Sequence, residues 1–160
     1  MILQYNPKRE VILDTVRLPF GISREIARVL LGNTHKEENE EFHFPDEEPI
    51  NQRRDVYNRM DASGEYFFLL YDRNDLLKEV EMHHCKKIRV FDIEFGFTDD
   101  VDLIAEELSA HVAITEQEEG SYSFKDLGIS IISEKQMGGE ESNNLAYFYC
   151  TSDTGHWEKQ

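Results

Sequence analysis

Hydrophobic and polar positions along this chain follow the same order twice. An alternating stretch ends in Phe20-Gly21, and a second ends in Phe95-Gly96, 75 positions later. In both copies an apolar residue, then a hydroxyl residue (Ser23 or Thr98), and then a helical pattern follow the glycine. Serine and threonine are good helix N-caps, so each copy predicts a strand that leads into a capped helix.

The first copy predicts one strand from Glu10 to Leu18 and a helix that Ser23 caps and Gly32 ends. The apolar positions of this helix are Ile26, Ala27, Val29, Leu30 and Leu31. Residues 33–52 contain two prolines and many acids, which predicts a mobile loop. Strands are then expected at 54–59, 65–71 and 77–82, with turns between them.

The second copy predicts a strand from Lys87 to Phe95 and a helix capped by Thr98 or Asp99. Its apolar residues recur at helical spacing, as Val101, Ile104, Ala105 and Leu108. Further strands are expected around 111–116, 129–134 and 145–150, with Tyr122 and Phe124 added to the first by a hairpin. Residues 136–144 are the last long connection.

Together these elements predict an α+β fold in a single domain over residues 1–160. The expected architecture is a tandem β-α-β-β-β repeat, with units at about 10–86 and 87–151. It forms two four-stranded antiparallel sheets with two helices, each helix at a sheet end, and a pseudo-twofold axis relates the halves.

The net charge of −16 narrows the choice of partner. Residues 1–86 carry 12 basic and 17 acidic side chains, and residues 87–160 carry 5 and 16, so the excess lies in the second half. Such a field repels nucleic acid and anionic membranes and attracts a basic protein. A common alternative is that the acidity only keeps the protein soluble. There is no apolar stretch long enough for a membrane span and no secretory signal pattern, so we expect a cytoplasmic protein with free Cys85 and Cys150.

Candidate catalytic and metal-binding residues are few. The run His83-His84-Cys85 lies in a predicted strand, whose neighbouring side chains point to opposite faces, so the three cannot share a metal without a bulge. Cys150 and His156 would join them only if the last strand lies alongside. No serine-hydrolase elbow, phosphate-binding loop or EF-hand is present. We therefore expect a protein that is not an enzyme and has no metal or cofactor, and keep a metal- or thiol-dependent enzyme as an alternative.

The chain resembles the small bacterial immunity proteins that are paired with contact-dependent growth inhibition toxins. The resemblance rests on the short acidic chain, the absence of catalytic motifs and the glycine–cap–helix–glycine segment from Gly21 to Gly32. The duplicated unit also resembles the Whirly fold, which some of these immunity proteins adopt. Whirly proteins bind single-stranded nucleic acid through a lysine-bearing strand, but this chain has no Lys-Gly-Lys element, so that activity is not carried over.

The resemblance implies a toxin inhibitor, and a toxin of nuclease type would offer a basic cleft. We expect the partner-binding residues in the more acidic second half: Asp99, Asp100, Asp102, Glu116, Glu118 and Glu119, with Tyr122 as an anchor. A second candidate surface is the acidic stretch Glu37, Glu38, Glu40, Glu41, Asp46, Glu47 and Glu48. An adaptor with another partner is the alternative function.

Overall fold

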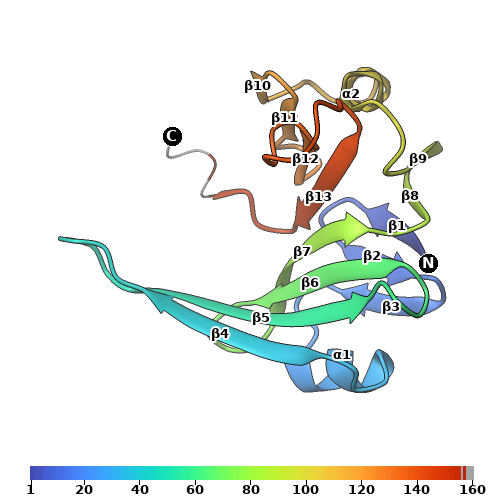
Figure 1. Ribbon diagram of the computed structural model, residues 1–160. Helices are drawn as coiled ribbons and strands as arrows, with labels where there is room; N and C mark the ends of the chain where they lie inside the picture. Colours follow the sequence, from blue (N-terminus) through green and yellow to red (C-terminus); the bar gives the residue numbers. More distant parts are fainter. Residues whose placement is uncertain (156, 158–160) are drawn as a thin grey trace.

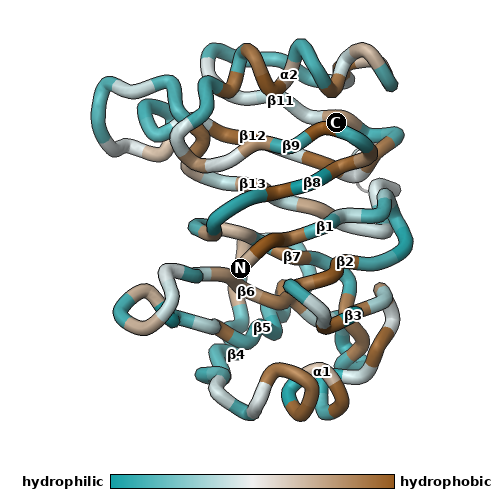
Figure 2. The backbone as a smooth tube through the Cα atoms, turned by 90° about the vertical axis from the view of Figure 1, so that its right-hand side faces the viewer, coloured by the Kyte–Doolittle hydropathy of each residue, from teal (hydrophilic) through white to brown (hydrophobic). Residues whose placement is uncertain are grey.

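Two β-sheets packed face to face, with a helix at each end, form the α+β architecture of this protein (Figure 1). The structure is a computed structural model that describes residues 1–155 and 157. The helices are α1 (Arg24–Leu30) and α2 (Val101–Ser109). They lie at opposite ends of the molecule, as Figure 2 also shows.

The larger sheet has eight antiparallel strands in the order β10-β11-β12-β13-β7-β6-β5-β4. Its strands are β4 (Lys36–Phe42), β5 (Ile50–Arg59), β6 (Glu65–Tyr71), β7 (Leu77–His84), β10 (Glu116–Glu118), β11 (Ser121–Phe124), β12 (Ile129–Ser133) and β13 (Leu145–Thr151). Two four-stranded meanders thus meet edge to edge where β7 pairs with β13, with Val80 opposite Cys150. The β4–β5 hairpin extends beyond the body of the protein (Figure 1).

The smaller sheet has five strands in the order β3-β2-β1-β8-β9. Its strands are β1 (Ile2–Asn6), β2 (Glu10–Leu13), β3 (Val16–Pro19), β8 (Lys87–Val90) and β9 (Ile93–Phe95). The pairing of β1 with β8 is parallel and joins the two halves of the chain a second time. The other pairs are antiparallel.

One hydrophobic core fills the space between the sheets. Tyr5 from the smaller sheet is fully buried, packs edge-on against Phe148 of β13 and donates its hydroxyl to the Leu127 carbonyl at 2.6 Å. Because both halves supply buried residues to this core, neither half encloses an apolar interior of its own.

The two halves have corresponding backbone features at an offset of 77 residues. The β2–β3 turn has Asp14 at φ 56°, and the β8–β9 turn has Phe91 at φ 56°. The Arg24 N–H donates to the Asp75 carbonyl at 2.8 Å, and the Val101 N–H donates to the Asn143 carbonyl at 2.9 Å. Arg24 therefore corresponds to Val101, and the offset of 75 suggested by the two Phe-Gly pairs is wrong by two residues.

Several predicted elements differ from the observed ones. The sheets have five and eight strands, not four each, because the meanders pair edge to edge and the N-terminal hairpins form a separate sheet. The predicted strands 10–18 and 87–95 are hairpins, broken at Asp14 and Phe91. Residues 111–115 are not a strand, and residues 33–52 include β4 and the start of β5.

Other predictions are confirmed. Ser23 caps α1, and its side chain accepts a hydrogen bond from the Ile26 N–H. Gly32 follows the C-cap residue Leu31 with φ 81°, the left-handed conformation that ends helices. The strand over residues 65–71 has the predicted bounds, and those over 129–133 and 145–151 differ by one residue at their ends. One cap differs from the prediction, because Asp100 caps α2 in place of Thr98 or Asp99.

Candidate functional site

Helix α1 turns its apolar side chains outward. Ile26, Val29 and Leu30, three of the apolar positions of the predicted helix, expose 53%, 62% and 46% of their surface. Only Ala27 and Leu31 of the five predicted apolar positions are buried. An exposed apolar cluster on a helix is a feature of protein–protein contact surfaces.

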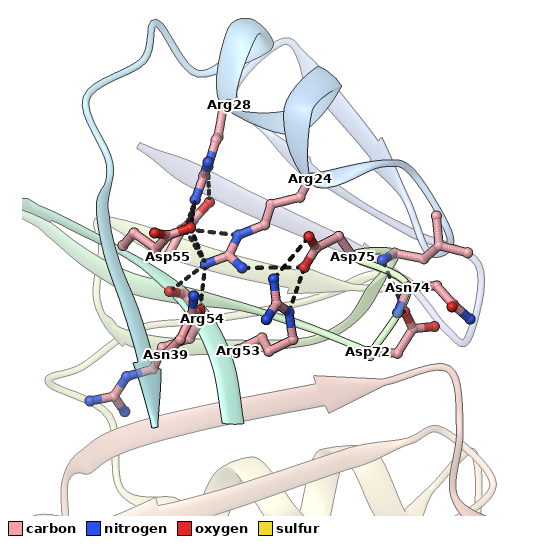
Figure 3. Close-up of polar contacts among 11 residues, drawn as sticks. Arg24, Arg28, Asn39, Arg53, Arg54, Asp55, Asp72, Asn74 and Asp75 are labelled. Carbon is pink, nitrogen blue, oxygen red and sulfur yellow. Dashed lines mark hydrogen bonds and ion pairs between the residues drawn. The ribbon is translucent and has the colours of Figure 1, made fainter. Parts of the chain in front are cut away.

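The inward face of α1 carries two arginines instead. Arg24 is 3% exposed and Arg28 is half-buried, and both reach Asp55 on β5, whose side chain is fully buried (Figure 3). A buried carboxylate needs charged or hydrogen-bonding partners to offset its desolvation. The two guanidinium groups supply them.

Asp55 accepts four hydrogen bonds from these arginines. Arg24 donates through Nε at 3.1 Å and Nη2 at 2.7 Å, both to Oδ1. Arg28 donates through Nε to Oδ2 at 2.7 Å and through Nη2 to Oδ1 at 2.7 Å. Two-pronged arginine–carboxylate contacts are strong and directional, so they fix the rotation of α1 about its axis.

A second carboxylate extends the network toward the surface. Asp75 accepts from Arg53 Nε at 2.7 Å and Nη2 at 3.0 Å, and from Arg24 Nη1 at 3.2 Å (Figure 3). Glu37 on β4 accepts from Arg28 Nη2 at 3.0 Å. Three arginines and three carboxylates are therefore linked, and their formal charges cancel. Cations already paired in this way are not available to bind a phosphate.

The pKa of the Asp55 carboxyl is lowered despite burial. Desolvation alone would raise it, but hydrogen bonds from Arg28 and then Arg24 favour the ionised form more strongly. The pKa of Asp75 is also lowered, mainly by its hydrogen bond from Arg53. Neither group is set to exchange protons near neutral pH. The network holds α1 in place.

Helix α1 is inverted, with its apolar side chains facing outward and its arginines facing inward. Helix α2 does not share this inversion. The offset of 77 places Val101 and Ala105 of α2 where α1 has Arg24 and Arg28, and both are buried. The outward residues that correspond to Val29 and Leu30 are Glu106 and Glu107. Strand register places Tyr122 on β11 where the first half has Asp55 on β5. The second half thus has an ordinary amphipathic helix, and the first half has an inverted one.

Acidic side chains border the exposed face of α1. A hollow of about 570 Å³ between α1, β4 and the β6–β7 turn is lined by Glu25, Glu37, Val29 and Asp75, with Arg24 and Arg28 at its base. Beyond it, edge strand β4 carries four glutamates and is exposed along nearly its whole length. Four acids of the stretch predicted as a loop, Glu37, Glu38, Glu40 and Glu41, therefore lie on a strand next to the helix, and Asp46, Glu47 and Glu48 lie in the connection between β4 and β5.

The predicted site residues of the second half separate into groups. Asp100 caps α2, and Asp99 accepts from the Gly96 N–H at 2.7 Å, so both have structural partners. Asp102, Glu118, Glu119 and Tyr122 line one hollow of about 640 Å³, together with Gln117, Gly120, Lys135, Glu141 and Asn143. Glu116 lies on β10 and does not line this hollow.

Tyr122 has little surface to offer a partner. It is 8% exposed, and its hydroxyl donates to Asp102 at 2.5 Å, a bond that raises the pKa of Tyr122 to about 12. The exposed part of this hollow is polar, made of Gln117, Glu118, Glu119, Lys135 and Glu141, and it lacks the apolar centre that α1 offers.

The residues of the enzyme alternative do not converge. In the described part of the chain, no three His, Cys, Asp or Glu side chains are arranged to hold a metal ion, and His156 lies outside that part. Cys85 and Cys150 are free and buried, and burial raises both thiol pKa values, that of Cys85 to about 12. Among residues 1–155 and 157, no helix is both long and apolar enough to cross a bilayer.

Sequence reasoning missed the network of Arg24, Arg28, Asp55 and Asp75. One signal was available, because Arg24 and Arg28 are four residues apart and share a helix face with Ala27 and Leu31. Nothing in the local sequence marks Asp55 as their partner, 27 residues beyond Arg28. No family model, curated protein or solved structure matches this chain. The resemblance to immunity proteins therefore rests on sequence features alone.

Proposed function

We propose that this chain is a binding protein that acts by covering a surface of a partner protein. The outward apolar face of α1 carries this proposal. Exposing three large aliphatic side chains while two arginines are buried beneath them is costly for an isolated domain. A partner that covers Ile26, Val29 and Leu30 removes that exposed apolar surface from water.

The partner we propose has an apolar centre and basic groups around it. Glu25 borders the helix face, and Glu40 and Glu41 of β4 extend the negative rim, since Glu37 and Glu38 are already paired with Arg28 and Arg54. Such a rim attracts and orients a basic partner, while the apolar centre slows its dissociation. The net charge of −16 acts in the same direction over longer distances.

Within this class, we propose an immunity protein that neutralises a cognate toxin of nuclease type. A nuclease cleft must be basic to hold phosphates, so an acidic protein with an apolar contact helix can block it. The duplication of a Whirly-like unit is proposed with it, supported by the paired turns and paired cap hydrogen bonds at an offset of 77 residues. The alternative function is an adaptor that binds another basic protein through the same surface and does not protect cells from a toxin.

The first experiment is co-expression of the chain with the product of the gene upstream of it, followed by purification of any complex. Cells that die when the neighbour is expressed alone and survive when both are present support the immunity proposal. A stable complex with a harmless neighbour favours the adaptor. A harmless neighbour that forms no complex counts against the proposed pairing.

The contact surface is tested with the double variant Ile26→Gln/Val29→Gln. We expect the affinity for the partner to fall by about thirtyfold or more, because two anchor side chains lose their apolar contacts. The matched control is Leu103→Gln on α2, since Leu103 corresponds to Ile26 and is 62% exposed, like Val29. The control is expected to bind normally.

The alternative surface is tested by reversing the charges of Glu116, Glu118 and Glu119 together. If that variant loses binding and Ile26→Gln/Val29→Gln does not, the contact lies at the second-half hollow and the assignment to α1 is wrong. Equal thermal stability of all variants is the required check, because each changed side chain is exposed.

A further inference from the structure

The face of the eight-stranded sheet that points away from α1 and the core carries a continuous series of aromatic rings. Strand alternation sends Asp55, Phe67 and Leu69 inward and their neighbours to the opposite face, here called the open face. The series runs across the β7–β13 junction, where the two halves of the sheet meet. Its members are Tyr66, Phe68, His83, Tyr147, Tyr149 and Trp157.

The rings are close enough to form one platform. The centroid of the His83 ring lies 4.6 Å from that of Phe68 and 5.4 Å from that of Tyr147. The rings of Tyr147 and Tyr149 are nearly parallel, at 11°, with centroids 6.4 Å apart. Trp157 follows at 6.3 Å from Tyr149.

Two carboxylates lie along this platform. Glu81 accepts a hydrogen bond from the Tyr147 hydroxyl at 3.0 Å, and Glu79 accepts one from the Tyr149 hydroxyl. Their side chains are 18% and 17% exposed, so both acids are held largely within the sheet surface and still reach solvent. The tyrosine hydroxyls fix the orientation of the carboxylates.

Within the part of the chain that the structure describes, no arginine or lysine lies within 4 Å of the Glu81 carboxylate. Glu79 has Lys78 Nζ at 3.3 Å, but among the described residues the only basic group within 4 Å of Glu81 is His83, whose Nε2 lies at 3.8 Å. That nitrogen is buried and has no hydrogen-bond partner in the described structure. A half-buried carboxylate next to aromatic rings, without an arginine or lysine, is a site that a cation would complete.

We propose that the open face at the β7–β13 junction binds an arginine or lysine side chain of a polypeptide, through Glu81 and the rings of Tyr147 and Tyr149. A guanidinium group stacks on an aromatic ring and pairs with a carboxylate in the same plane, and this surface offers both. Rings on a sheet face also serve for stacking of nucleic-acid bases. Here Glu81 and Glu79 lie beside the rings of Tyr147 and Tyr149, where they repel a phosphate backbone. Arg54, which stacks on Phe68 at 4.6 Å, is already paired with Glu38, so the surface favours the cationic side chain.

This surface is separate from the proposed α1 contact, because it lies on the opposite face of the sheet. The proposal does not depend on the immunity function and is tested without the partner. The probe is a short peptide of alternating arginine and glycine, and the matched peptide replaces arginine by citrulline, its neutral counterpart. Binding to the full chain is measured by calorimetry and by the fluorescence of Trp157, the one tryptophan of the sequence.

We expect the arginine peptide to bind and to change the Trp157 emission, and the citrulline peptide to bind at least tenfold more weakly. Glu81→Gln should weaken the arginine peptide by about tenfold, while its side-chain oxygen still accepts from Tyr147. The matched control is Glu118→Gln on β10, which removes the same charge at an exposed position on the edge of the sheet, four strands away from Glu81.

Three outcomes would overturn the proposal. Equal losses in Glu81→Gln and Glu118→Gln would mean unlocalised attraction to an acidic protein. Equal binding of both peptides would exclude recognition of the cation. Binding of an oligothymidine strand that Glu81→Gln strengthens would instead assign the aromatic platform to nucleic-acid bases. Thermal midpoints of the variants show that any change in binding is not a loss of fold.

Discussion

Asp55 is the residue on which the placement of α1 depends most. Its buried carboxylate accepts from both inward arginines, and removal of its charge leaves Arg24, at 3% exposure, with the more exposed Asp75 and Glu37, at 3.2 and 3.6 Å, as its anionic partners. Breaking a buried pair from one side is far more costly than replacing the whole pair.

We expect Asp55→Asn to lower the free energy of unfolding by about 3–5 kcal/mol, as measured by urea denaturation. The control is Glu38→Gln, which breaks the more exposed pair between Glu38 and Arg54 and should change it by less than about 1 kcal/mol. A loss of the same small size in both variants would show that the network contributes little to stability.

Asp55 also makes the free energy of unfolding depend on pH, and its contribution falls as the pH falls. The folded pKa of Asp55 is below its unfolded value of about 3.9, so its contribution is complete above about pH 5 and is lost as pH falls through the folded pKa. The difference in unfolding free energy between the natural protein and Asp55→Asn should therefore be constant at neutral pH and shrink below about pH 4. A constant difference down to pH 2 would contradict the lowered pKa.

At the scale of elements, the two helices are alternative solutions to the same packing problem. Residues 24, 28 and 55 form an ionic contact in the first half, and the corresponding residues Val101, Ala105 and Tyr122 form a mainly apolar one in the second. Both contacts hold a helix against a four-stranded meander. They differ in what they leave on the outside of the helix.

We expect the triple variant Arg24→Val/Arg28→Ala/Asp55→Tyr to fold and to recover most of the stability that Asp55→Asn loses. Replacing a complete buried ion network by apolar groups is often neutral or stabilising. The measurement is again urea denaturation, with Arg24→Val alone as the control that leaves Asp55 half-paired. A triple variant that is no more stable than Arg24→Val would show that the two halves do not correspond as their hydrogen bonds indicate.

At the scale of the whole molecule, the charge is long-ranged and the contact is local. Exposed charges separated by more than about 10 Å are screened at ordinary salt, whereas apolar contact is not. For the proposed basic partner, we therefore expect the acidic field of the molecule to set the association rate and the α1 face to set the dissociation rate.

For any basic partner, we expect the association rate to fall about tenfold or more between about 50 and 500 mM salt, with little change in the dissociation rate. Surface plasmon resonance separates the two rates. In Ile26→Gln/Val29→Gln the dissociation rate should rise, while the salt dependence of the association rate should stay the same. A dissociation rate that rises steeply with salt would mean that the contact itself is ionic.

The sequence by itself determined the elements whose periodicity is local and strong. Ser23 and Gly32 define the ends of α1, Val101, Ile104, Ala105 and Leu108 define the buried face of α2, and residues 65–71 define a strand. Caps, turns and alternation act within a few residues of one another, so they are visible in the chain. The overall α+β class follows from the order of these elements.

Only the tertiary structure decided which face of α1 points inward. Periodicity places Arg24, Ala27, Arg28 and Leu31 on one side and Ile26, Val29 and Leu30 on the other, and hydrophobicity favoured burial of the second set. Asp55 reversed that preference, because leaving its buried carboxylate without the two arginines would cost more than exposing the three aliphatic side chains. Pairing between strands far apart in sequence likewise joined β7 to β13, since backbone edges carry no side-chain signal of their partner.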